Sequence, residues 1–295
     1  MITTQKSFLL LSLLLFLLTF NAHTQESQDS TLIQQKVKVT TTTGDIFLGI
    51  LTNYDPTYYY ITTEYGELKL DRDKVKKVKK DTYQGAYSFG NPNATRYFFA
   101  PTGVPIQKDE GYYQNIYVTV NMVNYGVSNN FSMGGGIELI TLLSGNPVGF
   151  LSPKIGFKLT EKLHTGGGVF LGGSPNMDGE SFLAGIGYWV ITYGTADANI
   201  TAGAGYLWAS TDGETESLEA PLLTFSGMKR VSRSIALVSE NYIYTGELDD
   251  TSPYKGIQGI RIMSQKNTFD IGLLIVPEIT DEILGIPYLS YVRYF

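Results

Sequence analysis

The sequence predicts an all-β protein, in which an antiparallel transmembrane β-barrel of about twelve strands follows a small β-domain. Three observations predict this fold class. Long segments alternate apolar residues with small or polar ones, which is the period of a β-strand. Glycine (32), tyrosine (21) and phenylalanine (15) are abundant in the 295 residues, whereas only 17% are charged, below the roughly 25–35% of a soluble surface. Short and long connections also alternate along the chain.

The stretch ADANITAGAGYLWAS, residues 196–210, decides which face of a strand is inside. Its apolar face carries Ala198, Ile200, Ala202, Ala204, Tyr206 and Trp208, and its other face carries Asp197, Asn199, Thr201, Gly203 and Gly205. A soluble sandwich would place charged and bulky polar groups on its solvent face, yet here that face is repeatedly glycine. Glycine suits a crowded lumen, so we expect the apolar face to point outward, with the aromatic residues as a girdle near the rim.

Residues 1–24 have the pattern of a secretory signal peptide. Lys6 precedes an apolar run from Phe8 to Phe20, and small or polar residues follow before a predicted cleavage site at Gln25. The alternative is an uncleaved membrane anchor, but this run is short against the roughly 20 residues that cross a bilayer. Residues 25–35 are a polar leader. The absence of cysteine excludes lipoprotein attachment, disulfides and thiolate metal sites.

Residues 36–80 predict a compact β-domain of four or five short strands. Turn signals at Gly44-Asp45, Asp55-Pro56 and Tyr65-Gly66 separate its strand-like runs. This order of strands and turns resembles a small SH3-like or Sm-like barrel. The five lysines between Lys74 and Lys80 are expected to form a solvated strand edge, with a contact to anionic head groups or cell wall as the alternative. Residues 81–93 are expected to be a linker.

The barrel is expected to occupy residues 94–295. The predicted strands are 94–100, 112–125, 131–141, 149–159, 162–172, 181–193, 196–209, 219–229, 232–244, 255–264, 267–277 and 286–295. Short turns on one rim and long loops on the other are typical of bacterial outer-membrane barrels, whose short turns are periplasmic. With both barrel ends periplasmic the strand number must be even, so the long connection at 101–111 requires a strand at 94–100.

The chain ends in YLSYVRYF, a predicted strand whose last residue is Phe295. This stretch resembles the terminal signature of outer-membrane β-barrel proteins: Phe295, Tyr291 and Leu289 match it, while Arg293 and Pro287 depart from it. The resemblance covers roughly residues 94–295. It implies a Gram-negative outer membrane, with outer-membrane lipids around the barrel, insertion machinery that reads the C-terminal strand, and a periplasmic N-terminal domain with a partner there. The net charge of −6 and pI near 5.0 argue against a nucleic-acid partner.

The sequence predicts no enzyme, cofactor or metal site. It contains no phosphate-binding P-loop, HExxH or GxSxG motif. His164 is the one histidine that remains after cleavage. If it were catalytic, the barrel would be a lipid hydrolase; the structural alternative is that His164 is a polar neighbour of Lys158.

Four lumen charges are the candidate site residues. Counting back from the SQKN turn places Arg261 opposite Asp270, and counting around the loop at 142–148 places Glu138 near Lys154. They are interpreted either as a structural network that fills the barrel or as a constriction that selects solutes. Eight glycines are expected to point inward and widen the interior: Gly134, Gly136, Gly156, Gly166, Gly168, Gly203, Gly205 and Gly272.

Fold analogy makes a narrow channel or transporter for small solutes the leading functional hypothesis. The alternative is a structural or interaction protein with a plugged lumen and a partner-binding periplasmic domain. A barrel-embedded lipid hydrolase is the third.

Overall fold

The computed structural model describes residues 30–83, 85–177, 179–247, 251–279 and 283–295. The predicted signal peptide, 1–24, lies outside the described residues, as do residues 25–29 of the leader. The chain divides into two compact units, Met1–Tyr83 and Gln84–Phe295, which are described separately. Among the described residues, no helix has both the length and the apolar character needed to cross a membrane.

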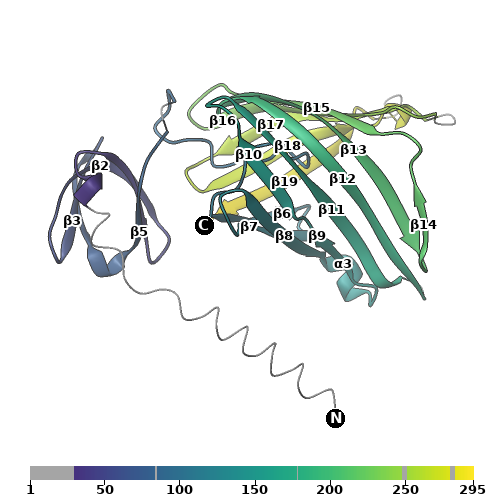
Figure 1. The fold of residues 1–295 in the computed structure, drawn as a ribbon, viewed down its shortest axis with the longest axis horizontal. Helices are drawn as coiled ribbons and strands as arrows, with labels where there is room; N and C mark the ends of the chain where they lie inside the picture. Colours follow the sequence, from purple (N-terminus) through teal and green to yellow (C-terminus); the bar gives the residue numbers. More distant parts are fainter. Residues whose placement is uncertain (1–29, 84, 178, 248–250, 280–282) are drawn as a thin grey trace, which may run out of the picture. The chain divides into compact units, whose positions relative to one another are not determined.

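The first unit is a five-stranded antiparallel sheet in the order β4-β3-β2-β1-β5 (Figure 1). The short helix η1 (Ser30–Leu32) precedes strands β1 (Lys36–Thr41), β2 (Ile46–Tyr54), β3 (Tyr58–Thr63) and β4 (Gly66–Asp71), and η2 (Arg72–Lys74) leads into β5 (Val75–Lys80). Val37, Val39, Leu51, Tyr59 and Ile61 form its buried core. The expectation of four or five short strands is confirmed, and the lysine-rich β5 is an edge strand; the likeness to an SH3 or Sm barrel stays a prediction.

The second unit is a closed antiparallel barrel with twelve strand positions (Figure 1). Its strands are β6 (Gly111–Ile116), β7 (Val120–Gly126), β8 (Phe131–Glu138), β9 (Val148–Leu151), β10 (Lys154–Lys158), β11 (Leu163–Met177), β12 (Glu180–Gly194), β13 (Ala198–Thr211), β14 (Glu214–Ser217), β15 (Leu222–Arg230), β16 (Ile235–Tyr244), β17 (Tyr254–Met263), β18 (Asn267–Ile275) and β19 (Ile286–Tyr294). β9 and β10 share one position, because both pair with β8 on one side and β11 on the other. β14 pairs antiparallel with the last residues of β13, beyond the part that pairs with β15, and β19 closes the barrel by pairing with β6.

The predicted number of strands is right, but two of the predicted strands are wrong. Residues 94–100 are not a wall strand; Arg96 and Pro101 form only an isolated bridge. Residues 112–125 are a hairpin, β6 and β7, instead of one strand. Its turn places Tyr117 and Val118 at φ 52° and 70°, a conformation that normally selects glycine or asparagine. The two errors cancel in the count.

The strand faces follow the outward assignment of the apolar residues. In β13, Ala198, Ile200 and Ala202 are exposed while Asn199 and Thr201 are buried. Apolar side chains exposed on other wall strands include Val123, Met133, Ile155, Phe157, Trp189, Ile191, Phe225, Leu237, Phe269, Ile271 and Leu289. Buried polar ones include Gln114, Ser132, Lys154, Thr192, Ser226, Glu240, Arg261, Thr268, Asp270 and Ser290. The barrel is therefore apolar outside and polar inside, the reverse of a soluble sandwich.

The two rims differ in their connections, as the sequence predicted. Residues 127–130, 160–162, 195–197, 231–234 and 264–266 are short turns between strands. The C-terminus lies at this rim, because Tyr294 donates its backbone N–H to Lys266. The other rim carries the longer connections, including the short helix α3 (Leu139–Leu143), the hairpin extension β14 and η3 (Pro277–Ile279), and also the tight β6–β7 turn.

Candidate functional site: an internal segment and its anchors

Residues 89–107, here called the internal segment, lie inside the barrel. Phe89, Tyr97, Phe98, Ala100 and Ile106 are buried. The segment forms hydrogen bonds with side chains from β10, β12, β13, β16, β17, β18 and β19. These strands span most of the barrel's circumference, so the internal segment obstructs the lumen. Part of the predicted linker, 81–93, and all of the predicted strand 94–100 thus belong to the lumen.

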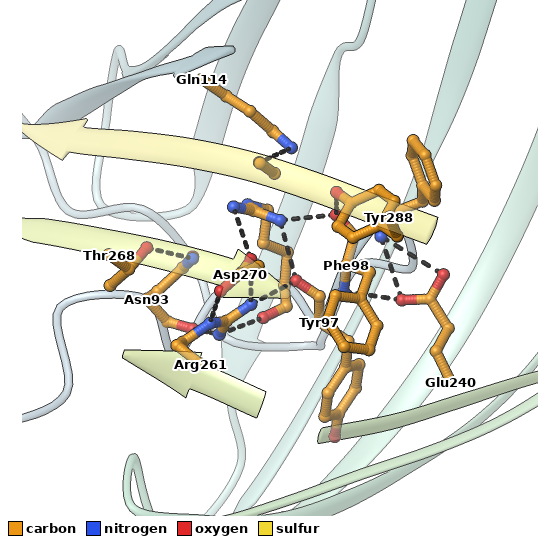
Figure 2. A network of polar contacts seen from close by, with 12 residues as sticks. Asn93, Tyr97, Phe98, Gln114, Glu240, Arg261, Thr268, Asp270 and Tyr288 are labelled. Carbon is orange, nitrogen blue, oxygen red and sulfur yellow. Dashed lines mark hydrogen bonds and ion pairs between the residues drawn. The ribbon is translucent and has the colours of Figure 1, made fainter. Parts of the chain in front are cut away.

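The first anchor is a buried ion pair between β17 and β18. Arg261 and Asp270 are cross-strand partners and both are fully buried, with Arg261 Nε 2.7 Å from Asp270 Oδ1 (Figure 2). The Arg261 guanidinium also donates to the carbonyl oxygens of Asn93, at 2.9 Å, and Tyr97. Arg96 of the internal segment approaches the same carboxylate, with Nη2 3.4 Å from Oδ2. The pair therefore binds both the backbone and a side chain of the segment.

The second anchor, Glu240 on β16, was not found from the sequence. Its carboxylate accepts backbone N–H hydrogen bonds from Phe98 at 2.8 Å, Phe99 at 3.0 Å and Ala100 at 3.0 Å (Figure 2). Tyr242 donates its hydroxyl to the same carboxylate at 2.6 Å. Hydrogen bonds to an ionised acceptor are about twice as strong as neutral ones. The available signal was an acidic residue at an inward position of a wall strand, in register with the buried Ala236 and Val238.

Lys154 on β10 is the third anchor, and Glu138, its predicted neighbour, does not contact it. Lys154 Nζ donates to the carbonyls of Val104 at 2.8 Å and Thr95 at 3.3 Å. Glu138 instead accepts the backbone N–H of Thr141 at 2.6 Å and caps α3.

The predicted proximity of Glu138 and Lys154 is therefore wrong. Lys154 lies opposite Ser132 and Gly168, whereas Glu138 lies opposite Val148. The connection that was counted as a loop contains α3, and the wall strand breaks between β9 and β10, so counting residues around the loop lost the register. Glu138 belongs to the long-loop rim instead of the lumen site.

A fourth anchor holds the internal segment near its start. Arg230 on β15 donates to the carbonyl of Phe89 at 2.7 Å and forms an ion pair of 2.9 Å with Asp197. Its guanidinium lies 4.1 Å and 4.6 Å from the ring centroids of Tyr87 and Phe89. This cation–π arrangement adds to the hydrogen bond. Arg230 was not predicted from the sequence as a site residue.

Three of the inward glycines, Gly156, Gly166 and Gly272, make room for the internal segment instead of leaving the lumen open. A Cβ on Gly156 would lie 2.9 Å from the carbonyl oxygen of Gly103. A Cβ on Gly166 would lie 3.5 Å from the Cα of Gly103, and one on Gly272 would lie 3.5 Å from the ring of Phe98. The prediction that glycine widens the wall's interior holds at these positions, but the space is filled.

A cavity of about 460 Å³ remains on the long-loop side of the internal segment. Its lining residues include Arg96, Phe99, Ile106, Met122, Phe150, Lys154, Phe170, Ile186, Tyr188 and Tyr242. The size falls in the range of small-molecule sites, about 300–1,000 Å³.

His164 lies in the barrel wall, and the described residues form no metal-binding cluster around it. His164 lies opposite Lys158 and Thr192 in the sheet, and its Nδ1 has no hydrogen-bond partner. Within the described part of the chain, no group of three or more His, Cys, Asp and Glu residues is arranged to hold a metal ion.

The chain was compared with protein families, curated proteins and solved structures. No protein-family model matches this chain, and no curated protein matches it. A solved structure described as "NanC porin structure in rhombohedral crystal form" is similar at 12% identity, over 63% of this chain and 96% of that chain, with a TM-score of 0.38.

Proposed function

We propose that the protein is an outer-membrane β-barrel channel for small solutes that the internal segment holds closed. The observation that carries this proposal is how the segment is attached. It joins the wall through side-chain hydrogen bonds and ion pairs, and its one β-bridge, Arg96 with Pro101, lies within the segment itself. The segment can therefore leave the lumen without breaking a pair of wall strands, whereas removal of a wall strand would open the barrel.

The apolar exterior supports the location. Strands that alternate apolar-out and polar-in around a closed barrel fit a bilayer, in which no sheet edge is exposed to lipid. On this proposal, the rim of short turns and the N-terminal unit are periplasmic, outer-membrane lipids surround the apolar belt, and the insertion machinery reads the strand that ends at Phe295.

Conductance of the purified protein in planar lipid bilayers tests the proposal. Glu240→Gln keeps the shape of the side chain and one acceptor oxygen but removes the charge, and hydrogen bonds to an ionised acceptor, such as those from the N–H groups of Phe98, Phe99 and Ala100, are about twice as strong as neutral ones. We expect wild type to be mostly closed and Glu240→Gln to open several-fold more often. Glu216→Gln, an exposed change on β14, is the matched control and should behave as wild type. A Glu240→Gln barrel that is folded and as silent as wild type would contradict a movable segment.

A permanent plug is the second candidate, and one observation favours it. Arg261, Asp270 and Glu240 are all fully buried, and separating such groups from their partners is costly. The protein would then be a structural or interaction protein, with the domain at 36–80 as its partner-binding part. If neither the wild type nor the anchor variants conduct ions in bilayers, the permanent plug is favoured over the channel.

A further inference from the structure

The cavity between the internal segment and the long-loop rim has charges at one end and apolar walls at the other. Arg96 and Lys154 lie at its inner end, against the internal segment. Phe150 and Phe170, which stack with ring centroids 5.8 Å apart, and Ile186 line its outer part. A ligand that fits this cavity has a polar head and an apolar body.

The charged end is positive. No Asp or Glu side chain is among the described residues that line the cavity. Lys154 is nine-tenths buried, and its ammonium is held by two carbonyl oxygens, with no carboxylate within ion-pair distance among the described residues. A third ammonium hydrogen remains for a ligand. A buried cation without a counter-ion is unfavourable, so an anion in the cavity would be stabilised there.

Arg96 gives independent support. Arg96 is 4% exposed and lines the cavity. The one carboxylate near it, Asp270, is shared with Arg261 at the shorter distances of 2.7 and 3.0 Å. One carboxylate for two guanidinium groups leaves a net positive charge beside the cavity, which an anionic ligand would offset.

We propose that this cavity binds an amphiphilic monoanion, with its carboxylate on Lys154 and Arg96 and its hydrocarbon body along Phe150, Phe170 and Ile186. The site does not depend on conduction, because a closed barrel can bind such a molecule. If the internal segment does move, a ligand on Arg96 and Lys154 would touch both the segment and the wall.

Equilibrium binding of radiolabelled decanoate to the full-length protein in phosphatidylcholine nanodiscs tests the proposal. We expect saturable binding at one site per barrel, with no competition from acetate, which lacks the body, or decyltrimethylammonium, which reverses the charge. Lys154→Met should weaken binding at least tenfold and Lys154→Arg should restore most of it. Lys158→Met, on the same strand but exposed, should bind as wild type.

A second variant separates loss of the site from loss of folding. Ile186→Trp fills the apolar end and leaves both cations in place, so it should abolish decanoate binding while the barrel keeps its heat-modifiable mobility on detergent gels. The proposal is overturned if decanoate does not bind, if decyltrimethylammonium competes equally, or if folded Ile186→Trp binds as wild type. Conductance is not measured here, so these outcomes are independent of the channel proposal.

Discussion

Arg261 and Asp270 lie directly opposite each other on adjacent wall strands, and both fully buried side chains also bind the internal segment. One carboxylate serves two guanidinium groups, of which one belongs to the wall and one to the segment. The ion pair therefore joins two parts of the chain that strand pairing does not join.

Arg261→Ala is expected to loosen the internal segment and lower barrel stability together. The change removes the donors to the carbonyls of Asn93 and Tyr97 and leaves Asp270 with the longer contact to Arg96. Breaking a buried pair on one side costs about 3–5 kcal/mol. We expect a lower unfolding temperature on heat-modifiability gels, a several-fold higher open probability in bilayers, and a shift of ion preference toward cations.

Arg293→Ala is the control for that experiment, because Arg293 is exposed and its side chain donates a 3.4 Å hydrogen bond to Asn267, away from the internal segment. It should change neither quantity. A fall in the Arg261→Ala unfolding temperature without any opening would assign the ion pair to a permanent plug.

Gly156→Ala is expected to displace the internal segment by steric contact alone, without a change of charge. The new Cβ would lie 2.9 Å from the carbonyl oxygen of Gly103 and 3.1 Å from the nitrogen of Pro105. Overpacking of this kind costs about 1–3 kcal/mol. Limited proteolysis should cut the internal segment faster than in wild type. Gly187→Ala, where a Cβ meets nothing within 4 Å, should leave the cleavage rate unchanged.

Strand alternation and register were predictable because both depend on local spacing. The SQKN turn is short, so counting from it places Arg261 opposite Asp270, as in the structure. The two-residue period of a strand also predicts that the side chains of Asn199 and Thr201 point into the barrel and that of Ile200 points outward, as observed.

The internal segment was not predictable, because its conformation depends on side chains distant in sequence. TRYFFAP is as apolar and aromatic as a strand, but Glu240, Arg261 and Lys154 bind its backbone amide and carbonyl groups, which would otherwise need a neighbouring strand. The β6–β7 hairpin was missed for a related reason. Side chains of Asn115 and Asn121 hold its turn through the backbone of Val118, so the turn lacks the usual glycine.

Asp55 should make the first unit sensitive to acid. Its carboxylate accepts the backbone N–H groups of Thr57 at 2.7 Å and Tyr58 at 2.8 Å and the hydroxyl of Tyr60 at 2.9 Å. These hydrogen bonds, the backbone ones first, hold the pKa of Asp55 below its usual value because they favour the charged form. A lowered folded-state pKa stabilises the fold above the unfolded-state pKa, and this contribution is lost as pH falls through the folded-state pKa.

Asp55→Asn should therefore lower the urea midpoint of the first unit near neutral pH and have a smaller effect below about pH 3. The midpoint is followed in the full chain by hydrogen-exchange mass spectrometry of β2 and β3 peptides, with labelling at one fixed pH. Asp73→Asn, an exposed change on η2, is the control. An Asp55→Asn effect of equal size at every pH would contradict a role for the charge.

The orientation of the barrel is the last prediction, and single cysteines test it in a chain that has none. Glu216 on β14 is exposed at the long-loop rim, Lys162 is exposed in a short turn, and Glu64 is exposed in the first unit. Because the short turns of such barrels are periplasmic, we expect an impermeant maleimide to label Glu216→Cys on intact cells. Lys162→Cys and Glu64→Cys should react only after the outer membrane is permeabilised. Labelling of Lys162→Cys but not Glu216→Cys on intact cells would invert the orientation, and recovery of the protein in the soluble periplasmic fraction would reject the membrane location altogether.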